Sequence, residues 1–229
     1  MNMDIFHFTL LLHIATGTIA LVIAPLAMAT VKGGLWHRRW GKIFFWAMAG
    51  VALSATVMCF IRTGLFLFLV AIFSFYFGLT GYTVLQRKRP EDPPGLLDWC
   101  AAIGMLLAGI VFVTTGAVDA NLGAERWLRL VFGSFGLLLG GMDIRRFFKP
   151  HTGKRAWMFE HMGRFLGAYI ATVTAFSVVN FQFLPSFLRW FWPTAIGVPL
   201  IIVWQRYYKR KFNREAQRQA APLATVNPR

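Results

Sequence analysis

Seven strongly apolar runs, most of them about 20 residues long, dominate this sequence, and an α-helix needs such a run to cross a bilayer. Hydrophobic residues make up 57% of the 229 residues and charged residues only 14%, whereas about 25% of a typical soluble protein is charged. We therefore exclude a soluble globule, a disordered chain and a disulfide scaffold, and predict an all-α, polytopic membrane helical bundle. The seven predicted spans cover residues 5–30, 43–62, 65–86, 97–118, 127–144, 157–180 and 187–206.

Basic residues are distributed unevenly between the two ends of these spans. Nineteen of the 24 Lys and Arg residues fall at one end and four at the other. The nineteen are Lys32, Arg38, Arg39, Lys42, Arg87, Lys88, Arg89, Arg145, Arg146, Lys149, Lys154, Arg155, Arg206, Lys209, Arg210, Lys211, Arg214, Arg218 and Arg229. Because cytoplasmic connectors carry the excess of Lys and Arg, we predict an N-terminus outside the cell and a C-terminus inside it.

The same pattern divides the chain into two parts and indicates its partners. Residues 1–206 are the predicted transmembrane domain, and residues 207–229 are a polybasic cytoplasmic tail. The formal net charge of +15 is spread over connectors and this tail, so we expect no nucleic acid partner. The expected partners are the lipid bilayer and, at the tail, anionic lipid, which attracts juxtamembrane basic residues. The oligomeric state stays open.

Small residues recur at helical spacing in three spans, and such residues let membrane helices approach closely. They are Thr16, Gly17, Ala20 and Ala24 in the first span, Gly133, Gly136 and Gly140 in the fifth, and Gly163, Gly167 and Ala171 in the sixth. We therefore expect spans one, five and six near the centre of the bundle. The third span is rich in phenylalanine and is expected to face lipid in part.

Ionisable residues within a hydrocarbon region are costly and indicate a functional site where a partner is available. The sixth span contains Glu160, His161 and Arg164, of which the last two share a helix face. The predicted topology brings Asp143 and His37 to the same membrane face. We expect the two histidines, Arg164 and Asp143 to form a ligand-binding site, with His161 as proton-responsive group or metal ligand. In the alternative interpretation these residues are interfacial anchors, and Arg164 pairs with Asp143.

His13 is a separate ligand-binding candidate, in the outer half of the first span. A histidine at this depth is neutral or has a hydrogen-bond partner, and the expected companions are Thr9, Thr16 and Asn180. The sequence leaves open whether His13 binds a ligand or makes a structural hydrogen bond.

Several functional classes stay open, and the sequence does not decide whether the protein is an enzyme. We favour a binding or transport protein that takes an ion or small ligand at the inner-face site. A haem-bearing electron carrier would need two axial ligands at matching depth, which His13 and His161 do not provide. A metal-dependent hydrolase would use His37, His161 and Asp143 as metal ligands, although no usual zinc-binding spacing is present. A structural or assembly role is a further alternative.

Three motifs stand out among the spans. They are His13-x-x-x-Gly17, then Trp36-His37-Arg38-Arg39-Trp40-Gly41-Lys42, and His161-Met162 leading into Gly167-Ala168-Tyr169-Ile170-Ala171. Together they resemble a bacterial family of predicted polytopic membrane proteins known only as a domain of unknown function, over most of residues 8–182. The resemblance implies a multi-pass protein of the bacterial inner (plasma) membrane and draws attention to the three histidines, but it implies no activity.

Overall fold

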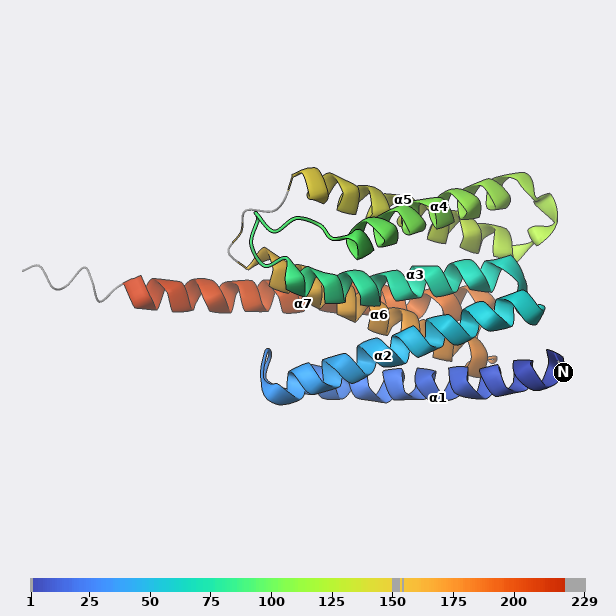
Figure 1. Ribbon diagram of the computed structural model, residues 1–229, viewed down its shortest axis with the longest axis horizontal. Coiled ribbons are helices and arrows are strands. Elements are labelled where there is room, and N and C mark those ends of the chain that lie inside the picture. The colour runs from blue at the N-terminus through green and yellow to red at the C-terminus, as the bar shows by residue number, and fades with distance from the viewer. Residues whose placement is uncertain (1, 150–152, 154, 221–229) are drawn as a thin grey trace, which may run out of the picture.

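The computed structural model describes residues 2–149, 153 and 155–220, and all regular structure in that part of the chain is helical. Seven helices there are long and apolar enough to cross a membrane, which confirms the predicted all-α bundle. They are α1 (Asn2–Ala29), α2 (Leu35–Met58), α3 (Gly64–Thr83), α4 (Leu96–Val118), α5 (Ala124–Phe148), α6 (Ala156–Asn180) and α7 (Ser186–Ala220), as Figure 1 shows. A π-helical turn, η1 (Cys59–Thr63), and two 3-10 turns, η2 (Val84–Gln86) and η3 (Ala120–Leu122), flank them.

Two helices extend beyond the predicted spans at the same end of the bundle. α2 begins at Leu35, so the basic motif at residues 36–42 forms its first two turns. α7 continues to Ala220 and carries most of the expected tail as helix, while residues 221–229 lie outside the described residues. A hydropathy pattern ends where charges begin, but Lys, Arg and Gln are good helix formers and continue the helix beyond the apolar run.

α3 lies at the centre of the bundle, where it contacts α2, α4, α5 and α6. α1 instead packs mainly on α2, and α5 mainly on α4, so the central placement expected for these two helices is wrong. The expectation that α3 faces lipid in part agrees with its exposed Leu65 and Leu67, but its phenylalanine rings are partly buried and pack between helices. Phe73 packs against Phe132 of α5, and Phe66 packs against Phe112 of α4 and Trp190 of α7.

The small residues do bring helices close together, and those of the first and fifth spans do so with the neighbouring helix in the sequence, whereas Gly167 of α6 meets Phe77 of α3. On α5, a Cβ added to Gly133 would lie 2.9 Å from the Cβ of Phe112 on α4. On α2, a Cβ added to Gly50 would lie 2.7 Å from Cγ2 of Thr16 on α1. In both cases the close contact joins a helix to its neighbour in the sequence, so it does not draw the helix into the centre of the bundle.

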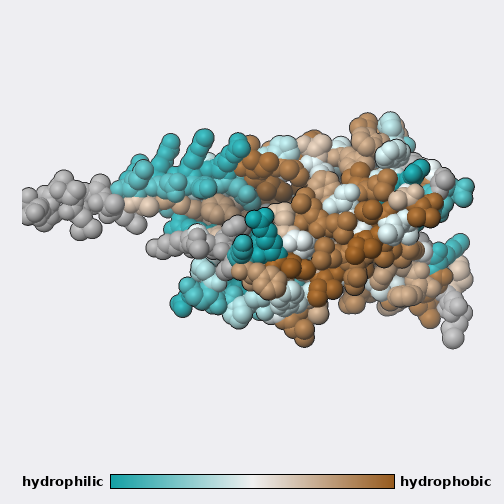
Figure 2. All heavy atoms as spheres, turned by 90° about the horizontal axis from the view of Figure 1, so that it is seen from above, coloured by the Kyte–Doolittle hydropathy of each residue, from teal (hydrophilic) through white to brown (hydrophobic). Residues whose placement is uncertain are grey.

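Basic residues gather where α1, α3 and α5 end and where α2, α4 and α6 begin, and we call this the basic end. Part of α7 projects beyond the bundle at this end (Figure 1). Figure 2 shows hydrophilic residues along the projecting helix and a broad hydrophobic surface on the body. Arg206, Arg210, Arg214 and Arg218 recur at a spacing of four and so follow one face of the projection.

Candidate functional site

The four side chains expected to form one inner-face site lie in two adjacent pairs. His37 and His161 line a cavity, whereas Asp143 and Arg164 form a buried ion pair. Both pairs adjoin Gly81 of α3. Its carbonyl oxygen accepts a hydrogen bond from His161 Nδ1, and a Cβ added to it would lie 2.9 Å from Arg164 Cβ. The close contact of α3 with α6 at Gly81 therefore lies between the two pairs, which the sequence predicts to form a single site.

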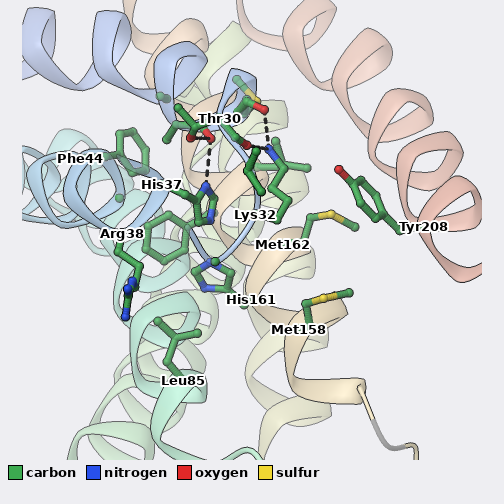
Figure 3. A pocket seen from close by; sticks show the side chains of 18 of the residues that line it. Thr30, Lys32, His37, Arg38, Phe44, Leu85, Met158, His161, Met162 and Tyr208 are labelled. Carbon is green, nitrogen blue, oxygen red and sulfur yellow. Dashed lines mark hydrogen bonds between the residues drawn. The ribbon is translucent and has the colours of Figure 1, made fainter. Parts of the chain in front are cut away.

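The first site is a cavity of about 950 Å³ at the basic end, lined by α1, α2, α3, η2, α6, α7 and the connectors after α1 and η2. We call it the histidine cavity. His37 comes from the first turn of α2 and His161 from the second turn of α6. Their ring centres are 6.4 Å apart and their planes meet at 79°. Figure 3 shows the two rings next to each other within the cavity wall.

Both histidine rings are oriented by the same kind of hydrogen bond. Nδ1 of His37 donates to the carbonyl oxygen of Ala27 at 2.9 Å, and Nδ1 of His161 donates to that of Gly81 at 2.8 Å. A carbonyl oxygen only accepts, so the neutral rings carry their protons on Nδ1 and hold a lone pair on Nε2. The described residues provide no hydrogen bond to either Nε2 atom, which leaves two oriented lone pairs.

All the charged side chains that line the histidine cavity are basic, among the residues that the structure describes. They are Lys32, Arg38, Lys42, Lys88 and Lys211. Lys32 Nζ donates to the carbonyl oxygens of Met28 and Thr30 and lies 5.1 Å from the ring centre of Trp204. Burial lowers the pKa of Lys32 below its usual value, because a partly apolar surrounding disfavours the charged form. Such a cavity attracts negative charge.

Most of the remaining wall is apolar. Side chains of Phe44, Leu85, Met158 and Met162 contribute to it, as Figure 3 shows. Ligand sites usually combine an apolar wall with a few oriented polar groups. The histidine cavity has this composition, with the two Nε2 atoms and the basic side chains as its polar groups.

The second site is a buried ion cluster that joins α3, α5 and α6. Asp143 and Arg164 are only 3% and 5% exposed. Arg164 Nη2 donates to Asp143 Oδ1, and the Tyr76 hydroxyl donates to Asp143 Oδ2. Arg146 Nη1 contacts Asp143 Oδ1 at 3.4 Å and Glu160 Oε1 at 3.3 Å. Two arginines and two carboxylates balance, so the cluster is neutral and holds three helices together.

This cluster agrees with the alternative sequence interpretation in one respect, since Arg164 pairs with Asp143. Arg164 does not reach towards the head groups, however, because its guanidinium is buried 5.0 Å from the ring centre of Tyr76. Its Nη1 has no hydrogen-bond partner among the described residues. Tyr76 is not among the residues predicted from the sequence, where its only signal is a phenolic hydroxyl inside an otherwise apolar, phenylalanine-rich run.

His13 lies apart from both sites, in the contact between α1 and α2. Its Nδ1 lies 3.0 Å from Ser54 Oγ and 3.2 Å from the carbonyl oxygen of Val51. The expected companions are not its partners, because α2 supplies Ser54 instead. Thr16 bonds the backbone carbonyl of His13 rather than its ring, and Thr9 and Asn180 bond their own helices. The geometry is that of a structural hydrogen bond.

The expected three-ligand metal set is not assembled. Among residues 2–149, 153 and 155–220, no group of three or more His, Cys, Asp or Glu side chains could hold a metal ion. Asp143 is occupied by Tyr76 and two arginines and does not join His37 and His161. A catalytic zinc site with three protein ligands therefore has no geometric support in this part of the chain.

The comparisons with known proteins add no family to this description. Neither a protein-family model, nor a curated protein, nor a solved structure matches the chain.

Proposed function

We propose that this membrane protein binds a small ligand, with an apolar body and at least one negative charge, in the histidine cavity. The observation that carries the proposal is the lining of that cavity, in which five basic side chains and no described carboxylate surround a largely apolar space of about 950 Å³. Opposite charges attract more strongly near a low-dielectric wall than in water. The Nε2 atoms of His37 and His161 can accept from a hydrogen-bond donor on the ligand, the basic side chains bind its negative charge, and the ion cluster keeps α6 in place beside them.

Of the ions and small ligands expected from the sequence, one chemical class fits the histidine cavity. A free metal cation is a poor match, because it would enter a cavity of positive charge with two protein ligands. An uncharged apolar molecule would leave the basic side chains without a partner. An amphipathic anion satisfies both parts of the wall, and a binding or transport protein for such a molecule is the function that the geometry supports best.

The removal of two cavity lysines is expected to weaken the binding of an amphipathic anion. Lys32 and Lys211 line the cavity, and Trp157 and Trp204 in the same wall report binding through their fluorescence. Dodecanoate should bind the purified protein, and Lys32→Gln with Lys211→Gln should weaken it about tenfold, because each partly exposed charge contributes up to about 1 kcal/mol.

Lys149→Gln is a control for each of the two single substitutions, because it removes one charge at the basic end without touching the cavity. Dodecanol, which differs from dodecanoate in lacking the charge, should bind weakly to all variants. Equal affinity of wild type and double variant for dodecanoate, or equal affinity for the acid and the alcohol, would contradict the proposal.

We also propose that the protein resides in a bacterial inner membrane with the basic end in the cytoplasm. The basic connectors support this orientation, and the three histidine-containing motifs support the bacterial family. The arginine face of the projecting α7 suits the anionic head groups of the inner leaflet.

Reporter fusions test this orientation. A fluorescent protein fused after Arg229 is expected to be bright, and a phosphatase that is active only outside the cytoplasm is expected to be inactive at the same position. The same phosphatase fused to the N-terminus is expected to be active. An active phosphatase after Arg229 would show that the orientation is the opposite of the one proposed.

A further inference from the structure

We infer that the ligand class of the histidine cavity is an iron porphyrin, with His37 and His161 as its two axial ligands. The inference rests on the proposed function and names the molecule class that the cavity would hold. The distance between the two histidine rings supports it. Two imidazoles on opposite faces of one metal ion, with metal–nitrogen bonds of about 2.1 Å, have ring centres about 6–6.5 Å apart. The observed separation is 6.4 Å.

The hydrogen bonds of the two rings also suit axial ligation. A metal-ligating histidine almost always donates its other ring N–H to a carbonyl or carboxylate, which fixes the tautomer and the ring orientation. His37 and His161 both do so through Nδ1, towards Ala27 and Gly81. Each Nε2 lone pair can therefore bind iron without a change of tautomer or a loss of protons.

The count of protein ligands distinguishes a porphyrin from a free ion. Two histidines are too few for a free zinc ion, which takes four ligands, and no third candidate stands near them in the described chain. A porphyrin brings four nitrogen ligands of its own, so two protein ligands complete six-coordination. Iron binding then replaces the water or chloride of free haemin by two Nε2 atoms, and no electron is transferred.

The other side chains that line the cavity suit the carboxylates and the macrocycle of an iron porphyrin. The two carboxylates of protoporphyrin find basic partners among Lys32, Arg38, Lys42, Lys88 and Lys211. The flat apolar macrocycle finds aromatic and methionine side chains in the wall. His37 and His161 both lie at the basic end of the bundle. They therefore lie at a similar depth, as two axial ligands must, whereas His13 and His161 do not.

Titration with haemin tests the inference. The wild-type protein in detergent should bind haemin as a six-coordinate, low-spin complex, with sharp visible bands after reduction. His37→Ala and His161→Ala should each abolish the low-spin spectrum and weaken haemin binding by more than about 10-fold, since even the loss of a partner that orients a ligating histidine costs about 10–100-fold. Added imidazole should restore the low-spin spectrum. His13→Ala, which removes a histidine outside the cavity, should behave as wild type.

Metal-free protoporphyrin IX separates the inference from the proposed function. It has the same shape and carboxylates as haemin but no iron, so its binding should be unchanged in both cavity variants, which also shows that they fold. A high-spin complex of the wild type, or a low-spin complex that persists in His37→Ala, would overturn axial ligation by the two histidines. If metal-free porphyrin or dodecanoate still bound, the proposed function would nevertheless be supported. Binding of none of the three molecules would overturn both.

Discussion

Replacement of Asp143 by alanine is expected to destabilise the folded bundle by about 3–5 kcal/mol, because it leaves buried arginine charge without its partner. Asp143 receives hydrogen bonds from Tyr76 and Arg164 and an ion pair from Arg146, and its side chain is only 5% exposed. The loss should appear as a lower midpoint of unfolding, followed by tryptophan fluorescence in detergent with increasing denaturant.

A paired substitution shows whether charge, rather than volume, causes this loss. Asp143→Leu combined with Arg164→Met replaces the ion pair by apolar side chains, and such replacements are often neutral or stabilising. The double variant should therefore recover most of the stability that Asp143→Ala loses. An Asp143→Ala variant within about 1 kcal/mol of wild type would show that the cluster does not hold α3, α5 and α6 together.

Replacement of Gly81 by alanine is expected to damage both sites at once. The added Cβ would lie 2.5 Å from Phe165 Cδ2 and 2.9 Å from Arg164 Cβ, so α3 and α6 must move apart. Overpacking of this kind costs about 1–3 kcal/mol. The displacement would also lengthen the hydrogen bond that orients His161, so dodecanoate binding should weaken as well as stability.

Gly104→Ala is the matched control, because a Cβ at this position in α4 would meet nothing within 4 Å. It should be neutral or should stabilise the helix by about 0.5–1 kcal/mol. Ligand binding should be unaffected in this variant. If Gly81→Ala proved as stable as Gly104→Ala and bound dodecanoate normally, the α3–α6 contact would not be the element that positions His161.

The sequence predicts the helices of this protein better than their arrangement. Length and hydropathy identify all seven helices, since a bilayer requires both. They cannot show that α3 is central, because lipid chains and a protein interior are equally apolar and both accept phenylalanine. The rings of Phe66 and Phe73 contact other helices, whereas the sequence alone gives them no preference for protein over lipid.

The sequence predicts at which end of the helices the candidate residues lie, but it does not predict that they form two separate sites. Charge and topology place His37, His161, Asp143 and Arg164 at one end, and all four lie there. A spacing of three puts His161 and Arg164 about 60° apart around α6, which is close enough to suggest one site. Only the three-dimensional contact shows that Gly81, a residue without a side chain, admits α3 next to both of them.

Pro199 lies in α7 just before the part of this helix that lines the histidine cavity. Trp204, Tyr208 and Lys211 all follow Pro199 along this helix, and α7 packs mainly on α6. A proline removes one backbone hydrogen bond and so weakens a helix at that point. A bend of α7 at Pro199 would therefore displace Trp204, Tyr208 and Lys211 together and change the width of the cavity.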